Sequence, residues 1–291
     1  MRTTTRLREL LASPGIVPAP GAYDCLSAAV IERAGFPVVY MTGAGTSISR
    51  TGYPDIGLTT MSEMVANAAA IARTVSVPVI ADADTGYGDV LQVQRTVREY
   101  ERAGVAGIHI EDQESPKRCG HLDDKRVVPQ EEMVRKLQAA LDAREDDDFT
   151  IIARCDALAV TGWDDALRRC EAYVEAGADV LFLEAIQTRE QATDVTGRFD
   201  VPVLYNFVET GKSPLLPVAE LEALGFKLVI FPISAMLAAL RTMTDLMREL
   251  RETGTTAHLV ADRMVSIQEC FDTVGLSDML ALDAAYAGSV R

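Results

Sequence analysis

The stretch Ala103-Gly104-Val105-Ala106-Gly107-Ile108-His109-Ile110-Glu111 contains the transition that decides the fold. An amphipathic segment ends at Ala103-Gly104, where glycine can adopt the left-handed conformation that terminates a helix. The apolar run 107–110 is then a short predicted strand, and the acid Glu111 follows it directly. Strands that are apolar throughout are typical of a parallel sheet buried on both faces.

The same unit recurs along the chain. A residue followed by glycine ends a helical segment again at 34–35, 176–177 and 224–225, and Val-Pro-Val enters a strand at 77–79 and 201–203. The predicted strands are 16–19, 38–41, 79–81, 107–110, 150–153, 180–183, 203–205 and 228–231. Eight alternating strand and helix units favour a (β/α)₈ barrel over an open doubly wound sheet, because the first glycine-rich turn is not GxGxxG.

The end of the chain has more helical pattern than a barrel requires. Periodicity predicts helices over about 236–251, 258–274 and 277–286, whereas one closing helix would be enough. We therefore expect a single barrel domain, 1–291, in which 236–291 is a helical extension that packs on a neighbouring subunit.

Composition narrows the partners and the compartment. The chain has 291 residues, is 48% hydrophobic and has a formal net charge of −15, which disfavours nucleic acid and anionic membrane as partners. No signal-like or membrane-spanning run is present, so we expect a soluble, cytoplasmic protein. The five cysteines are scattered without CxxC spacing, which argues against a disulfide framework and a structural zinc site.

Acidic side chains gather where strands end, which is where barrel enzymes place their catalytic groups. Asp82 and Asp84 follow one strand and Glu111 follows the next. Each alone could cap a helix or solvate a loop, but several at one barrel mouth repel one another unless a cation is present. Hard oxygen ligands without cysteine suit Mg²⁺ or Mn²⁺, with water completing the coordination.

Other strand-end residues suit an anionic substrate. Arg154 can either pair with Glu184 or Asp156 or grip a substrate carboxylate. The loop 43–47 offers backbone N–H groups, and Asn206 and Ser213 offer neutral donors. His109 is either a hydrogen-bonded core histidine or a catalytic group.

A thiol lies in the loop after the fourth predicted strand. Cys119 is surrounded by Lys117, Arg118 and His121, so its pKa is expected to be lowered, although a surface loop with an incidental cysteine would have the same composition. Gly120 gives this loop freedom to fold tightly or to move. A metal, cations and a thiol together suit the formation of an enolate or aci-carboxylate that Cys119 then protonates.

At these residues the chain resembles the isocitrate lyase/phosphoenolpyruvate mutase superfamily over almost its whole length. The motifs are Tyr40-Met41-Thr42-Gly43-Ala44-Gly45, Asp82-Ala83-Asp84-Thr85-Gly86-Tyr87-Gly88, Glu111-Asp112-Gln113, Lys117-Arg118-Cys119-Gly120-His121 and Ala153-Arg154-Cys155-Asp156-Ala157. The resemblance implies a (β/α)₈ barrel, a homotetramer in which the terminal helix is exchanged between subunits, and a Mg²⁺ site with Asp84 as the most direct ligand. Asp55, Asp82 and Glu111 would act there partly through water, and Cys119 would be the general acid on a gating loop.

Residues and resemblance together give one set of candidates. The catalytic candidates are Cys119, Arg154, Glu111 and His109. The substrate-binding candidates are Tyr40, Thr42, Gly43, Ala44, Lys117, Arg118, Gly120, His121, Arg154, Glu184, Asn206, Ser213 and Pro232.

The loop sequence also indicates a branch of the superfamily. Lys-Arg-Cys-Gly-His resembles the methylisocitrate lyase and dimethylmalate lyase branch, whereas 206–214 is nearer to dimethylmalate lyase and carboxyphosphonoenolpyruvate phosphonomutase. We expect a Mg²⁺-dependent lyase that cleaves a C–C bond of a small 2-hydroxy di- or tricarboxylate. The alternatives are a phosphonomutase, an oxaloacetate decarboxylase or hydrolase, and a non-catalytic barrel that binds a metabolite.

Overall fold

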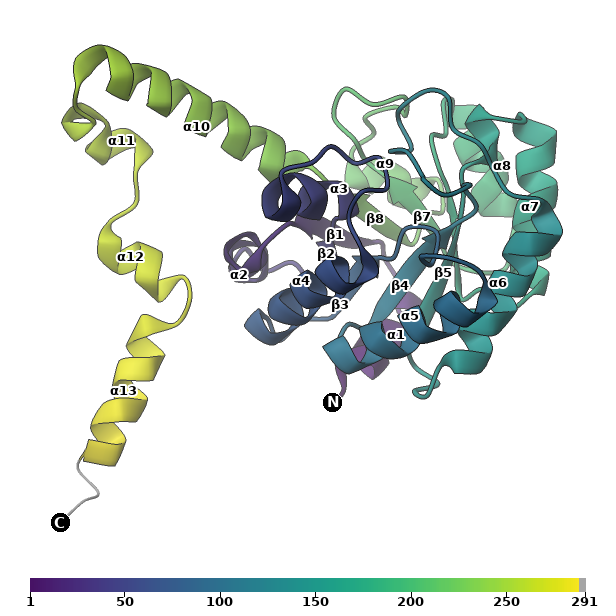
Figure 1. Ribbon diagram of the computed structural model, residues 1–291, viewed down its shortest axis with the longest axis horizontal. Helices are drawn as coiled ribbons and strands as arrows, with labels where there is room; N and C mark the ends of the chain where they lie inside the picture. Colours follow the sequence, from purple (N-terminus) through teal and green to yellow (C-terminus); the bar gives the residue numbers. More distant parts are fainter. Residues whose placement is uncertain (288–291) are drawn as a thin grey trace. The chain divides into compact units, whose positions relative to one another are not determined.

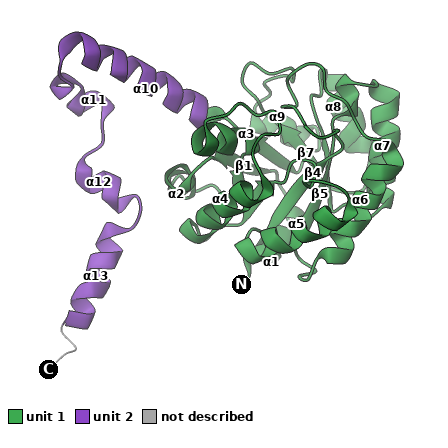
Figure 2. Ribbon diagram, in the orientation of Figure 1, with its two compact units in different colours: residues 1–234 green, residues 235–291 purple. Residues whose placement is uncertain are grey.

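The computed structural model describes residues 1–287. The chain divides into two compact units, Met1–Ser234 and Ala235–Arg291 (Figure 2). The two units are described separately below.

The first unit is a closed barrel of eight parallel strands in sequence order (Figure 1). The strands are β1 (Val17–Ala22), β2 (Val39–Met41), β3 (Val79–Asp82), β4 (Gly107–Glu111), β5 (Thr150–Cys155), β6 (Val180–Leu183), β7 (Val203–Asn206) and β8 (Leu228–Phe231). β8 pairs with β1 and closes the sheet on itself. The predicted barrel and its eight strands are confirmed, and no strand edge is left open.

Helices surround the barrel, and local sequence sets where they begin. They are α1 (Thr3–Ala12), α2 (Cys25–Arg33), α3 (Gly43–Thr46), α4 (Met61–Thr74), α5 (Val90–Ala103), α6 (Gln130–Ala143), α7 (Trp163–Glu175), α8 (Arg189–Arg198) and α9 (Val218–Ala223). A reciprocal capping box opens α2, α4, α5 and α8. Gly104, with φ of 86°, ends α5 in the left-handed conformation expected from the sequence.

The core has two apolar layers. One lies between the sheet and the surrounding helices and includes Tyr100, Phe149 and Tyr173. The other fills the barrel interior, where Leu7 of α1 joins Phe182 and side chains of the other strands. Because α1 contributes to the interior cluster, it closes one end of the barrel, and the polar residues at the strand ends occupy the other.

Two local predictions are wrong. The expected loop at 43–47 is the short helix α3, because Thr42 caps it by accepting a hydrogen bond from the Gly45 N–H at 3.2 Å. The expected helix over 258–274 is broken into a short 3₁₀ helix (Ala257–Leu259), α11 (Val260–Arg263) and α12 (Ile267–Asp272). The break follows from extended backbone at Met264 and at Ser266, which caps α12.

The second unit consists of helices alone. α10 (Ser234–Thr253) leads into it, and α13 (Leu276–Ala287) is its last described helix. None of the residues of α10, α12 or α13 is buried. Within the described residues, no helix is both long and apolar enough to cross a membrane.

The packing of α1 gives a stability prediction. Leu7 is fully buried in the barrel interior, so Leu7→Ala should lower the free energy of unfolding by about 2–5 kcal/mol, because it removes apolar contacts and leaves a cavity. Leu91→Ala is the control, since Leu91 is 75% exposed, and should change stability by less than about 0.5 kcal/mol. Denaturant unfolding measures both, and equal effects would contradict the role of α1 in closing the barrel.

Candidate active site

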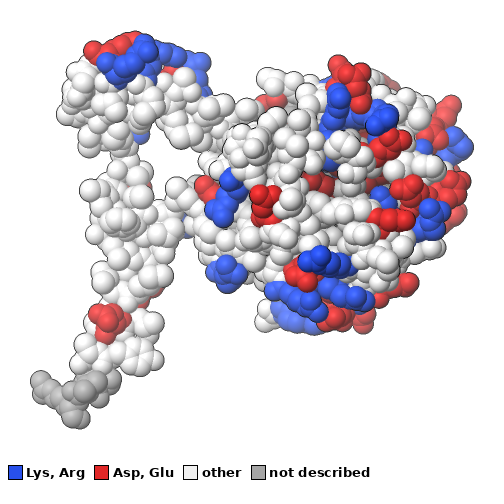
Figure 3. All heavy atoms as spheres, viewed as in Figure 1, with Lys and Arg blue, Asp and Glu red and all other residues white. Residues whose placement is uncertain are grey.

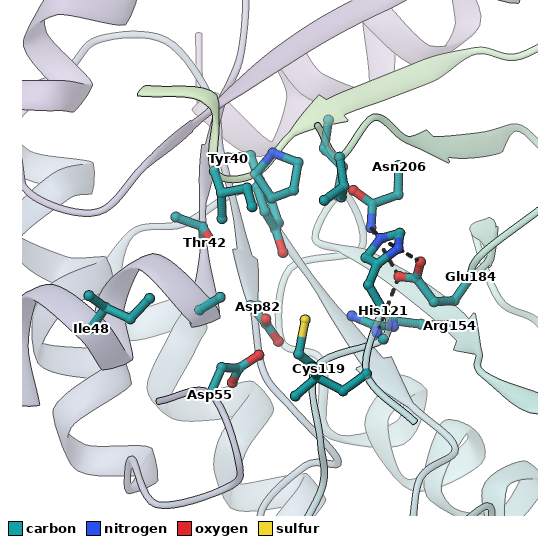
Figure 4. A pocket seen from close by; sticks show the side chains of 17 residues that line it. Tyr40, Thr42, Ile48, Asp55, Asp82, Cys119, His121, Arg154, Glu184 and Asn206 are labelled. Atoms are coloured by element: carbon teal, nitrogen blue, oxygen red, sulfur yellow. Dashed lines mark hydrogen bonds and ion pairs between the residues drawn. The ribbon is translucent and has the colours of Figure 1, made fainter. Parts of the chain in front are cut away.

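A cavity of about 250 Å³ lies at the carboxyl ends of the strands (Figure 4). Its polar lining comes from five strand ends and the loops beside them, and the lining as a whole includes nine of the thirteen predicted substrate-binding residues. The polar lining residues are Tyr40, Thr42, Asp55, Asp82, Cys119, His121, Arg154, Glu184 and Asn206. Gly120, Ala44 and Pro232 also line it, as the sequence predicted.

Arg154 is held among carboxylates at one side of the cavity. Its Nε donates to Asp156 Oδ2 at 2.7 Å, Nη1 lies 3.2 Å from Glu111 Oε2, and Nη2 lies 3.2 Å from Glu184 Oε2. Burial alone would lower the pKa of Arg154, but the three acids raise it well above its usual value. The guanidinium is therefore permanently charged and fixed, and it contacts the cavity as a preoriented anion site.

His121 and Asn206 complete this side. Asn206 Nδ2 donates to Glu184 Oε2 at 3.0 Å, and His121 Nε2 lies 3.3 Å from Glu184 Oε1 (Figure 4). Burial lowers the pKa of His121, which favours the neutral ring. Glu184 thus orients three donors that face the cavity.

His109 lies below the cavity and not in its lining. Its Nε2 is 2.8 Å from the Tyr40 hydroxyl, which does line the cavity, and its ring stacks on that of Tyr40 at 5.7 Å. Burial lowers the pKa of His109 to about 4, so the ring is neutral at pH 7. His109 is thus connected to the cavity by its hydrogen bond to the Tyr40 hydroxyl.

The predicted acids do lie together. Lys117 Nζ bridges two of them, at 2.5 Å from Asp55 Oδ1 and 2.8 Å from Asp84 Oδ1. Burial raises the pKa of Asp84 to about 6, and burial also raises the pKa of Glu111 well above its usual value. Lys117 is thus a single cation that interacts with all four acids of this cluster.

The cluster suits a hard cation. Asp84 Oδ1 and both Glu111 oxygens are buried and accept no hydrogen bond, although Lys117 and Arg154 lie at ion-pair distance. In the described residues, no three Asp, Glu, His or Cys side chains are arranged to hold a metal directly. Donors of this kind fit Mg²⁺ bound largely through water, and the residues that would hold it are Asp55, Asp82, Asp84 and Glu111.

The loop that bears Cys119 is closed at its base and lies over the cavity. Gln113 pairs with Val127 in an antiparallel bridge, and the Glu114 N–H donates to the Arg126 carbonyl at 2.9 Å. The Cys119 N–H donates to the Asp55 carbonyl at 3.1 Å. The thiol faces the cavity between the Asp82 side and the Glu184 side (Figure 4).

The expectation of a lowered pKa for Cys119 is wrong. Burial raises the pKa of the thiol, and Asp55 raises it further. Two of the three cations expected to oppose this are engaged elsewhere: Lys117 is paired with Asp55 and Asp84, and Arg118 is turned toward Asp124. A thiol that keeps its proton is suited to act as an acid and not as a nucleophile.

At two positions the backbone lies so close to charged side chains of the site that only glycine fits. A Cβ at Gly120 would lie 2.5 Å from Arg154 Nη2 and 2.7 Å from Glu184 Cδ. A Cβ at Gly43 would lie 2.2 Å from Asp82 Oδ2. Both backbones lie directly against charged groups of the site, so neither position has room for a side chain.

The structure does not bring every candidate into the lining. Arg118 points away and is about half exposed, and Ser213 is buried near Tyr205. The larger aliphatic lining residues were not predicted, because an aliphatic side chain gives no chemical signal in a sequence. They are Ile48, Leu122, Val208, Ile230 and Ile233.

The protonated state of Cys119 can be measured through its alkylation. We expect the rate of iodoacetamide labelling to rise with pH to a midpoint above that of an ordinary cysteine, about 8.5, because burial and Asp55 raise the pKa. Asp55→Asn should move the midpoint down, since it removes a negative charge. The same cysteine in denaturant is the control, and a native midpoint below the denatured one would contradict the assignment.

Relatives by sequence include three named enzymes. The chain is 48% identical over 287 residues to the 2,3-dimethylmalate lyase of Eubacterium barkeri, with 99% of each chain covered. It is 43% identical to the 2-methylisocitrate lyase of Aeropyrum pernix, covering 96% of this chain and 89% of the relative. It is 40% identical to the chloroplastic carboxyvinyl-carboxyphosphonate phosphorylmutase of Arabidopsis thaliana, covering 98% and 85%.

Solved structures with a fold similar to that of this chain include three named enzymes. A crystal structure of 2,3-dimethylmalate lyase, a PEP mutase/isocitrate lyase superfamily member, superposes with a TM-score of 0.94 at 41% identity, covering 100% and 97% of the two chains. Oxaloacetate acetylhydrolase with 3,3-difluorooxalacetate also gives 0.94, at 38% identity, covering 99% and 98%. Phosphonopyruvate hydrolase with oxalate and Mg²⁺ gives 0.89, at 33% identity, covering 99% and 100%.

The family of phosphoenolpyruvate phosphomutase matches residues 7–251, which include the whole barrel. The chain therefore belongs to this family and is an enzyme of the PEP mutase/isocitrate lyase superfamily, as are the named lyases among its relatives.

Proposed function

We propose that this protein is a Mg²⁺-dependent lyase that cleaves a C–C bond of a small 2-hydroxy dicarboxylate or tricarboxylate of the 2,3-dimethylmalate or 2-methylisocitrate type. The products are a 2-oxo acid and a second carboxylate. The observation that carries the proposal is that the Cys119 thiol, whose pKa is raised by burial, faces a cavity between the acid cluster and Arg154. The two lyase relatives, at 48% and 43% identity, support the same class of substrate.

Each side of the cavity has a task in this reaction. Arg154, with His121 and Asn206, binds one substrate carboxylate, and Thr42 with the backbone around Gly43 and Ala44 binds the other. When bound at Asp84 and its neighbours, Mg²⁺ would hold the substrate oxygens and stabilise developing negative charge. When the substrate hydroxyl loses its proton to solvent, the C–C bond breaks and leaves the 2-oxo acid and an aci-carboxylate. The Cys119 thiol then gives its proton to the carbon of the aci-carboxylate, and the thiolate takes up a proton from solvent.

The direct test is a panel of 2-hydroxy acids. Incubation with 2,3-dimethylmalate, 2-methylisocitrate and isocitrate should release pyruvate or glyoxylate from at least one, and a chelator should abolish the release until Mg²⁺ is restored. If no acid is cleaved in the presence of Mg²⁺, the proposal fails.

Phosphonomutase chemistry is the alternative, and it is supported by the Arabidopsis thaliana relative. Phosphorus NMR of an incubation with carboxyphosphonoenolpyruvate would detect this reaction.

A second test replaces Cys119 with serine and measures the same reaction. A hydroxyl is a far weaker acid than a thiol, so kcat should fall by about 100-fold or more while the KM changes little. Cys25→Ser serves as the control, because Cys25 begins α2 and does not line the cavity. Unchanged turnover in Cys119→Ser would remove the cysteine from the mechanism.

We also propose a homotetramer in which residues 236–291 pack on a neighbouring subunit, and a cytoplasmic location. Large apolar side chains such as Leu240, Met243 and Met247 are exposed on α10, and the face of the tail seen in Figure 3 has large stretches without charged side chains. The five free cysteines suit a reducing compartment, and recovery from an exported fraction would count against that location.

Sedimentation tests the assembly. The wild type should sediment at four times the chain mass of 31.5 kDa, and Leu240→Asp together with Met247→Asp should shift it to smaller species. Thr242→Asp adds charge on the opposite side of the same helix and should leave the assembly intact. A monomeric wild type would refute the proposal that the tail packs on a neighbouring subunit.

A further inference from the structure

Beside the cavity lies a buried polar cluster that lines none of it. Gln113 is 1% exposed, Lys125 7% and Asp156 0%, and all three lie behind the segment 118–120 that bears the thiol. A buried ammonium is costly to maintain, and an aliphatic side chain of the same size would pack at lower cost. A buried lysine at position 125 therefore indicates that its ammonium group has a specific structural role.

Gln113 clamps the residue before Cys119. Its Nε2 donates to the Arg118 carbonyl at 2.8 Å, and its Oε1 accepts from the Arg118 N–H at 3.0 Å. Both backbone groups of one loop residue are thus satisfied by a single side chain at the base of the loop. The same Nε2 also lies 3.2 Å from Asp156 Oδ1.

Lys125 clamps the residue after Cys119. Its Nζ donates to the Gly120 carbonyl and, at 3.0 Å, to Asp156 Oδ1. The thiol is therefore held by a side chain on each side of it in the sequence, and both of these side chains meet the same carboxylate.

Asp156 joins this clamp to the anion site. Its two oxygens accept from Arg154 Nε and Nη2, at 2.7 and 3.2 Å, and its N–H donates to Asp112 Oδ1 at 2.7 Å. Asp112 is in turn fixed by the Tyr173 hydroxyl at 2.7 Å. One carboxylate thus contacts both the clamp on Cys119 and the guanidinium that faces it.

We propose that Gln113 and Lys125 are positioning residues that act through Asp156 to fix the Cys119 segment against Arg154. Neither touches the cavity, so they act on catalysis only by setting where the proton donor stands relative to the bound carboxylate. This inference rests on the proposed lyase function. A displacement of about 1 Å in such a group can cost roughly 100-fold in rate.

The test uses Lys125→Met and Gln113→Met, with Lys125→Arg as the conservative variant and Arg126→Met as the matched control. Arg126 is the next residue of the loop, is largely exposed and pairs with Glu114 and not with Asp156. In Lys125→Met and Gln113→Met we expect kcat to fall by roughly 10- to 100-fold, more than KM changes. Lys125→Arg should recover part of the loss, and Arg126→Met should match the wild type.

Amide hydrogen exchange gives a readout that needs no substrate. Exchange of peptides within 114–126 should rise by about 10-fold or more in Lys125→Met and Gln113→Met, while peptides of the barrel strands exchange as in the wild type. A fall in kcat that comes with faster exchange throughout the barrel would show a merely structural role and overturn the proposal. Faster loop exchange with unchanged kcat would overturn it as well.

The outcomes separate this proposal from the proposed function. If the wild type cleaves none of the tested acids, the exchange measurement still decides whether Gln113 and Lys125 hold the Cys119 segment. If Lys125→Met does not fold, Gln113→Met carries the test, because it removes hydrogen bonds without leaving a buried charge unpaired. Unchanged loop exchange in a folded Gln113→Met would refute the clamp.

Discussion

The ion pair between Arg154 and Asp156 is the interaction on which the rest of the site depends. Both groups are buried, and both come from the end of β5. Burial alone would raise the pKa of Asp156, but Arg154 and Lys125 lower it to about 2. The pair therefore stays ionised over the physiological range, and removing either partner would unbalance a buried network of charges that also includes Lys125, Glu111 and Glu184.

The residues around this pair are held in two different ways, by strands of the barrel or by a loop. Arg154, Glu111 and Asp82 stand on strands whose neighbours are hydrogen-bonded on both sides, so their positions are set by the sheet register. Cys119 stands on a loop that reaches the same cavity only through contacts made by its own backbone and by a few side chains. Arg154, Glu111 and Asp82 are thus positioned by the sheet, whereas Cys119 is positioned by a loop that lies over the cavity.

Much of this arrangement could be predicted from the sequence. Glycine after a helix and short apolar strands gave the barrel, and charged residues directly after a strand gave Arg154, Asp82 and Glu111. What could not be predicted depended on burial and partners. Cys119 lies in a basic stretch of sequence, yet the nearby cations Lys117 and Arg118 are engaged by other acids. The aliphatic side chains that line the cavity could not be predicted, because they give no chemical signal in the sequence. The break within 258–274 was missed because extended backbone at Met264 leaves hydrophobic periodicity unchanged.

The close approach at Gly120 also determines which parts of the loop can vary. A side chain at this position would collide with Arg154 and Glu184, so the position is closed to substitution in any relative that keeps this loop geometry. Leu122, two residues later, lines the cavity and is 48% exposed, and Ile48 lines the cavity and is 51% exposed. Change in the size or polarity of the bound molecule can therefore be accommodated at the partly exposed aliphatic positions without disturbing the charged groups. The same scaffold can in this way diversify its ligands while its chemistry stays fixed.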